Sequence, residues 1–136
     1  MSICGIEMSG SEARLALLDG TKAAFSHIDV EPRKIKLSDD ENPGEVKAFR
    51  DSMLAFFREN QVTHVVIKKR GKKGEYSGGP VGFKLEGIIQ LHEECPVTLT
   101  APQTISAAQK NHNPAKPTSL KKYQHNAFET AFSALP

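Results

Sequence analysis

The sequence predicts a single α/β domain over residues 1–136, built on a mixed five-stranded sheet with helices on both faces. Short apolar runs separated by turn residues open the chain, which is typical of a three-strand antiparallel meander. Two β-branched runs follow, and each comes directly after a stretch with helical periodicity. Because a crossover through a helix returns the chain in the same direction, we expect these two strands to be parallel to the first.

The meander is expected to occupy the first 28 residues, with strands at 2–8, 13–18 and 23–28. The first strand is apolar on both sides except for Glu7, which favours a central position in the sheet. Asp19-Gly20 is a strong hairpin signal between the second and third strands. Glu7 must reach water, a cation or a hydrogen-bond donor, because burying an unpaired carboxylate is costly.

The rest of the chain is expected to alternate helices and strands after a polar surface connection at residues 30–41. Asn42 is the predicted N-cap of the first helix, with Pro43 in its first turn. Thr100 and Ser119 are the predicted caps of two later helices, which end near residues 110 and 135. The remaining expected elements are strands at 63–67 and 97–99 and a helix at 80–94.

Composition excludes some classes of protein. A net charge of +2 is too small to indicate nucleic-acid binding by itself, so the distribution of charge matters more. No apolar run approaches the roughly 20 residues that span a bilayer, and the N-terminus lacks the pattern of a secretory signal. Cys4 and Cys95 lie in apolar surroundings and are expected to be free buried thiols. We therefore expect a cytoplasmic protein without a membrane partner.

Residues 68–79 form the most unusual segment, which combines five basic residues with four glycines. The simplest interpretation is a solvated mobile loop. The alternative is phosphate binding by basic side chains and by backbone amides before the predicted helix. A second basic cluster near the C-terminus would lengthen such a phosphate track. The candidate phosphate or nucleic-acid ligands are Lys69, Arg70, Lys72, Lys73, Gly78, Gly79, Lys121 and Lys122.

The order of elements, with an acid at the end of the first strand, resembles the ribonuclease-H-like superfamily and its RuvC-type branch. Residues 4–7, Cys-Gly-Ile-Glu, stand where that family has an apolar-Gly-Ile-Asp strand. Lys68 follows the fourth strand, where the family has an acid. Asn126 and Glu129 stand among alanines in the last helix, where the family has two acids at this spacing. The chain also resembles a small bacterial family catalogued only as a domain of unknown function. That resemblance gives no information about an activity.

The RuvC-type resemblance implies a site in which carboxylates hold two divalent ions around an in-line displacement. Of the family's acidic positions, this chain keeps Glu7 and Glu129, whereas Asn126 is neutral and Lys68 would repel a metal. These four residues are a candidate remnant catalytic site, and Glu75 is a weaker substitute acid. A structural ion pair is the alternative role for the acids. We expect no cofactor, and magnesium or manganese at Glu7 and Glu129 only in a nuclease.

Three functions remain open from the sequence, because a fold alone does not choose among them. The favoured one is a nucleic-acid- or phosphate-binding module with a degenerate metal-nuclease site, since basic clusters accompany sparse acids. The second is an active, divergent metal-dependent nuclease. The third is a protein-interaction or regulatory domain that kept only the fold. Nucleic acid is thus the candidate partner, and the sequence does not distinguish a monomer from a homodimer.

Overall fold

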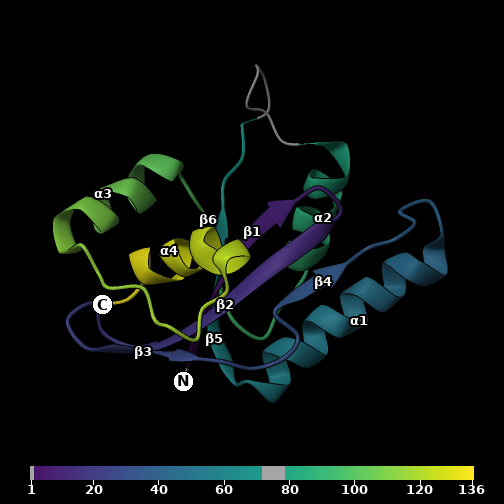
Figure 1. Ribbon diagram of the computed structural model, residues 1–136. Helices are drawn as coiled ribbons and strands as arrows, with labels where there is room; N and C mark the ends of the chain where they lie inside the picture. The colour runs from purple at the N-terminus through teal and green to yellow at the C-terminus, as the bar shows by residue number, and fades with distance from the viewer. Residues whose placement is uncertain (1, 72–78) are drawn as a thin grey trace.

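A mixed sheet forms the centre of the protein, and helices cover both of its faces (Figure 1). The computed structural model describes residues 2–71 and 79–136. The strands are β1 (Ser2–Ser9), β2 (Glu12–Gly20), β3 (Phe25–Ile28), β4 (Lys34–Lys36), β5 (Val62–Lys68) and β6 (Val97–Thr100). The helices are α1 (Pro43–Glu59), α2 (Pro80–Gln90), α3 (Pro102–His112), the 3-10 turn η1 (Lys122–Gln124) and α4 (His125–Ser133).

The strand order is β3-β2-β1-β5-β6, so β1 lies in the middle as its apolar sequence predicted. Ile6 pairs with Leu15 of β2 in the antiparallel direction and with Ile67 of β5 in the parallel direction. The predicted parallel contact between the first and fourth expected strands is therefore confirmed. Parallel neighbours place their carboxyl ends at the same edge of the sheet, which brings the end of β5 next to the end of β1.

The helix α4 lies directly on β1 because Gly5 leaves room for its backbone. A methyl group on Gly5 would lie 2.1 Å from the carbonyl oxygen of Ala127 and 2.5 Å from the amide nitrogen of Ala131. Phe128 and Phe132 of α4 are fully buried on this face of the sheet. On the opposite face, α1 and α2 cover the larger core, which includes Cys4 and Ile6 of β1. The close approach of α4 sets the position of every side chain that it carries toward the end of β1.

Residues 30–41 differ from the predicted surface connection, because β4 adds a sixth strand to the sheet. Ile35 pairs with Ala13 of β2, and Ile35 and Leu37 are 8% and 2% exposed. The alternation of apolar and basic residues over 34–37 is a strand signal. Charged and turn-forming residues flank this short run on both sides, so the whole segment was predicted to be a surface connection.

The predicted turns and caps were correct in part. Asn42 caps α1, because its Oδ1 accepts hydrogen bonds from the amides of Gly44 at 2.9 Å and Glu45 at 3.4 Å. The Thr100 cap was wrong, since Ala101 precedes α3 and offers no side-chain cap. The Ser119 cap was also wrong: its Oγ lies 2.7 Å from Nδ1 of His27.

Three predicted boundaries moved. The helix α2 ends at Gln90, short of the expected residue 94, and α4 begins only after η1. Asp19 and Gly20 belong to β2, and Gly20 pairs with Phe25 across a turn at residues 21–24. A longer turn thus replaces the two-residue turn that Asp-Gly predicts.

Both cysteines are free, and Cys4 is buried whereas Cys95 is half-buried. Desolvation raises the pKa of the Cys4 thiol far above its ordinary value, with a smaller contribution from Cys95. The Cys4 thiol is therefore protonated and unreactive at neutral pH. Across the described ranges, no helix is long and apolar enough to cross a membrane.

Candidate functional site

Glu7 stands at the carboxyl end of β1 with its side chain 18% exposed. Asn126 of α4 donates a hydrogen bond from Nδ2 to Oε2 of Glu7 at 2.7 Å. Arg14, the direct cross-strand partner of Glu7 on β2, places Nη1 3.8 Å from Oε1. Arg14 also donates from Nε to Oε2 of Glu12 at 3.1 Å, so it serves two carboxylates. Glu7 therefore has the two kinds of partner that a partly buried acid needs, a hydrogen-bond donor and a nearby cation.

A hollow of about 360 Å³ opens beside Glu7, where β1 and β5 end. Lys69 is fixed at its mouth by a backbone hydrogen bond of 2.8 Å from its amide to the carbonyl of Thr100. Among the described residues that line the hollow, one is an acid and three are cations. The lining residues are Glu7, Met8, Lys68, Lys69, Arg70, Gly71 and Pro102. Because positive charge exceeds negative charge around it, this hollow suits an anion.

Arg70 is held against the first turns of α2. Its guanidinium carbon lies 5.9 Å from the centre of the Phe83 ring. Nη1 occupies the space over Gly82, where an added methyl group would lie only 1.8 Å away. Within the described part of the chain, this buried nitrogen has no hydrogen-bond partner. The packing fixes the direction of the arginine more firmly than that of an exposed lysine.

The structure places the predicted site residues Lys68 and Asn126 beside Glu7 and gives Glu129 a separate ion-pair partner. Glu129 pairs with Lys116, whose Nζ lies 3.7 Å from Oε1, and it does not line the hollow. Lys68 lines the hollow with Glu7, but among the described residues it forms an ion pair with neither acid. Arg14 is the cation beside Glu7, and sequence reasoning missed it. The register of the first hairpin, with its turn at residues 10–11, was the signal that pairs position 7 with position 14.

The other predicted ligands lie in different places. Gly79 is the N-cap of α2 and offers no side-chain cap. Lys121 and Lys122 are exposed and lie at η1, beside the start of α4. Four further predicted residues lie outside the described part of the chain: Lys72, Lys73, Glu75 and Gly78.

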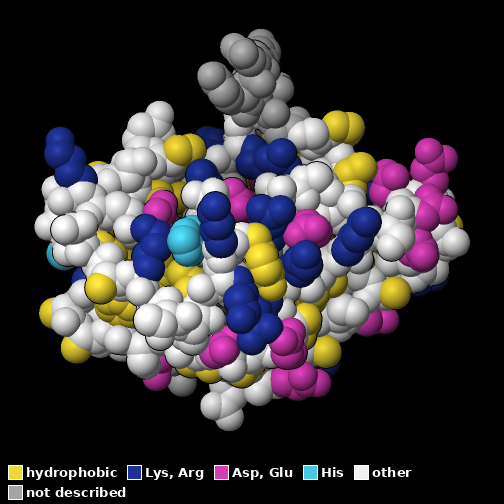
Figure 2. Space-filling model, viewed as in Figure 1, with side chains coloured by type: hydrophobic (Ala, Val, Ile, Leu, Met, Phe, Trp, Pro, Cys, Tyr) yellow, Lys and Arg dark blue, Asp and Glu magenta, His cyan; other side chains and the backbone are white. Residues whose placement is uncertain are grey.

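Basic side chains extend from the Glu7 hollow across the sheet. In Figure 2, lysine and arginine side chains gather over the middle of the face that Figure 1 presents, around β2, β4 and α4. Arg14 is the cross-strand neighbour of Lys34 on β4. The Nζ of Lys34 lies 4.8 Å from the centre of the Tyr123 ring in η1. Arg14, which also pairs with Glu12 at 3.1 Å, and Lys34 thus form a band between the hollow and the predicted basic residues Lys121 and Lys122 at η1, and these two linking residues were not among the predicted ligands.

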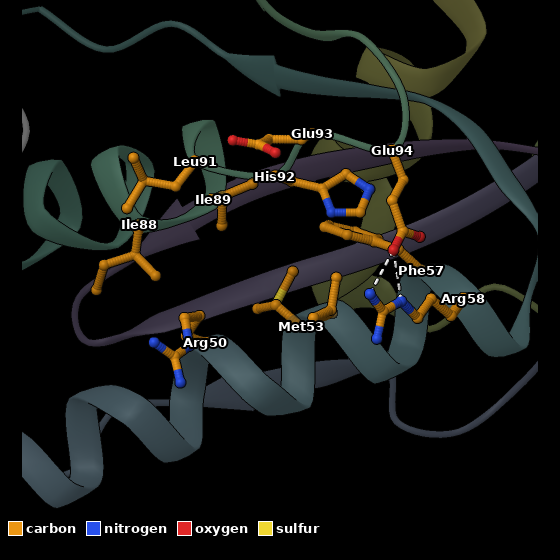
Figure 3. Close-up of a pocket in the computed structure, with 11 residues that line it drawn as sticks. Arg50, Met53, Phe57, Arg58, Ile88, Ile89, Leu91, His92, Glu93 and Glu94 are labelled. Atoms are coloured by element: carbon orange, nitrogen blue, oxygen red, sulfur yellow. Dashed lines mark hydrogen bonds and ion pairs between the residues drawn. The ribbon is translucent and has the colours of Figure 1, made fainter.

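A second hollow of about 240 Å³ lies between α1 and α2 on the other side of the sheet (Figure 3). Its floor is apolar, and the ring of His92 packs 4.9 Å from that of Phe57. Arg58 donates from Nε to Oε1 of Glu94 at 2.6 Å across one end, and this hydrogen bond holds the pKa of Glu94 below its ordinary value. Arg50 pairs with the adjacent Asp51 at 3.0 Å. Since acids compensate its cations, this groove lacks the surplus positive charge of the Glu7 hollow.

The fold defines a class, the ribonuclease-H-like fold of the RuvC type. Thermus thermophilus RuvC superposes with a TM-score of 0.73 at 13% identity, over 98% of this chain and 92% of that one. The same organism's RuvC in complex with a Holliday junction substrate gives 0.67 at 13% identity, over 98% and 91%. Fowlpox virus resolvase in complex with Holliday junction DNA gives 0.59 at 15% identity, over 98% and 95%. At these identities the likeness shows the fold.

Within this class, the chain belongs to the family described as "Protein of unknown function (DUF3010)", whose model matches residues 1–134. The comparison with curated proteins gives no match.

The residues present do not fit the pair of divalent ions that the RuvC-type fold implies. Magnesium prefers several hard oxygen ligands. At this edge, Asn126 directs an N–H group at Glu7, and Arg14 and Lys68 bring positive charge. In residues 2–71 and 79–136, no group of three or more His, Cys, Asp or Glu side chains could hold a metal ion.

Proposed function

We propose that this protein binds nucleic acid through phosphate contacts at the Glu7 hollow and the basic band beside it, and that its site is a degenerate form of a metal-nuclease site. One observation carries the proposal. The carboxyl ends of β1 and β5 surround a hollow with Lys68, Lys69 and Arg70, while Arg14 and Asn126 already bind its single described acid. The hollow therefore has cations available for a phosphate and no uncommitted carboxylate.

The electrostatics favour a polyanion over a single small anion. An exposed ion pair contributes only about 0–1 kcal/mol, so one lysine–phosphate contact binds weakly. A nucleic acid gains from several contacts together, because each neutralised phosphate releases condensed counterions. Lys68 and Lys69 at the hollow, Lys34 beside Tyr123, and Lys121 and Lys122 at η1 offer several cations along one path, whereas Arg14 between them pairs with Glu7 and with Glu12 at 3.1 Å. Binding should consequently weaken steeply as salt rises.

The choice of probe follows from proteins with the same fold. The Thermus and fowlpox structures are described as complexes with Holliday junctions. A labelled four-way DNA junction is therefore the first probe, together with duplex DNA, single-stranded DNA and RNA. Fluorescence anisotropy at low and moderate salt, with EDTA present, measures affinity without any contribution from divalent ions.

The decisive variant removes the two lysines of the hollow, Lys68→Ala with Lys69→Ala. Its matched control, Lys47→Ala with Arg50→Ala, removes the same charge from exposed positions on α1. We expect the hollow variant to bind roughly 10-fold more weakly and its log–log salt slope to fall by about 2. The affinity of the control variant should stay within about twofold of that of the parent. Equal losses in both variants, or a parent that binds none of the probes at low salt, would overturn the proposal.

A further inference from the structure

Tyr123 presents a partly exposed aromatic ring within the basic band. It lies in η1, directly after the exposed residues Lys121 and Lys122. Lys34 of β4 places its ammonium group over the ring. An aromatic side chain surrounded by cations is the combination that single-stranded nucleic acids use, since phosphates meet the cations and a base stacks on the ring.

The buried Gln124 holds this ring in place. Gln124 is 2% exposed, and its Nε2 donates to the carbonyl oxygen of Leu15 on β2 at 2.8 Å. Its Oε1 accepts a hydrogen bond from the amide of Lys121 at 2.9 Å. The nitrogen end of the side-chain amide therefore anchors η1 to the sheet, and its oxygen end closes the start of the turn itself. The ring next to it is preorganised, which lowers the entropy cost of placing a base on it.

Along the chain, Tyr123 also lies a short way from the Glu7 site. Asn126, which binds Glu7, comes three residues after Tyr123 along η1 and α4. Three residues of helix advance the chain by about 5 Å. Stacked nucleotides advance by about 3.4 Å each along a strand. A base on Tyr123 and a phosphate at the cations of the Glu7 hollow would thus belong to one strand.

We infer that Tyr123 is a stacking platform for an unpaired base, so that the protein prefers single-stranded or locally unpaired nucleic acid to a continuous duplex. This inference rests on the proposed function. In a duplex, neighbouring base pairs cover both faces of a base, whereas an unpaired base can expose one face to an aromatic ring. Lys34 covers the ring in the free protein and moves to a neighbouring phosphate when the base arrives.

The test compares Tyr123→Ala, Tyr123→Leu and Tyr123→Phe by anisotropy on one labelled single strand and on the duplex of the same sequence. Phe keeps the aromatic face, and Leu keeps apolar volume without it. We expect Ala and Leu to weaken single-strand binding about 10-fold, which corresponds to about 1.4 kcal/mol. The affinity of the Phe variant for the single strand should stay within about twofold of that of the parent. On the duplex, the affinities of all three variants should stay within the same range. A strand that carries 2-aminopurine should lose fluorescence on binding the parent and the Phe variant, but not the Leu variant.

The outcomes separate the two proposals. If the parent binds no nucleic acid, the proposed function fails and takes this inference with it. If the parent binds and the Leu variant equals it on the single strand, only the stacking inference fails. Equal loss with Leu and Phe, or equal loss on single strand and duplex, also overturns it. The Leu variant decides the matter if the Ala variant does not fold.

Discussion

Replacing Gly5 with alanine should destabilise the protein strongly, because α4 occupies the space that the new methyl group needs. The added carbon would lie 2.1 Å from the Ala127 carbonyl oxygen, 2.5 Å from the Ala131 amide nitrogen and 2.8 Å from the Ala131 side chain. Two of these atoms are backbone, so α4 must shift as a unit. Overpacking of a core costs about 1–3 kcal/mol, and the backbone clash places Gly5→Ala at the upper end.

Thermal unfolding followed by circular dichroism measures this effect. A loss of about 2–3 kcal/mol lowers the melting temperature of a domain of this size by roughly 10 °C. Gly87→Ala is the matched control, since an added methyl group there meets nothing within 4 Å and the residue lies inside α2. The control should be more stable than the parent by about 0.5–1 kcal/mol. A Gly5→Ala protein as stable as the parent would refute the direct packing of α4 on β1, and with it the position of Asn126 beside Glu7.

Three further predictions concern the site, pH and a helix cap. Lys68→Glu should introduce divalent-ion affinity, seen as a manganese-dependent rise in melting temperature that the parent lacks, because it replaces a repelling cation with a ligand. A parent that already binds manganese as tightly would contradict this. Desolvation lowers the pKa of His27 below its ordinary value of 6.5. The unfolded chain therefore binds this proton more readily than the folded protein. His27 thus contributes fully to folding stability above about pH 6.5, and this contribution is lost as the pH falls through the lower pKa of the folded state. Urea midpoints at pH 7.5 and 5.5 should differ less in His27→Gln than in the parent, and an unchanged difference would exclude His27 as the cause. Asn42→Ala should cost about 1 kcal/mol in urea unfolding through loss of the α1 cap, and no loss would mean that solvent satisfies those amides equally well.

The sequence predicted the centre of the fold because its signals there are local and agree with one another. An apolar first strand, a capped amphipathic helix at Asn42 and a β-branched run at 62–68 all specify the same parallel arrangement. The strand β4 escaped prediction, because a short run around Ile35 is stabilised by pairing with β2 and by burial in the core rather than by its own propensity.

The candidate site was predictable in position but not in its contacts. Glu7, Lys68 and Asn126 reach the same edge because the strand order and α4 bring them there. Arg14 belongs to the site through hairpin register, and Lys116 reaches Glu129 from a loop. Which cation pairs with which acid depends on distances of a few ångströms between segments far apart in the chain. Residue type and spacing do not determine such distances.

The central claim, nucleic-acid binding at a site that does not use metal-dependent hydrolysis, is tested most directly on one labelled four-way junction in EDTA and in manganese. Anisotropy gives the affinity under each condition, and a denaturing gel of the same samples shows whether the DNA is intact. The account predicts salt-sensitive binding in EDTA and uncut DNA in manganese. Binding that requires manganese, or cleavage in manganese that disappears in Glu7→Gln, would contradict it and establish an active nuclease.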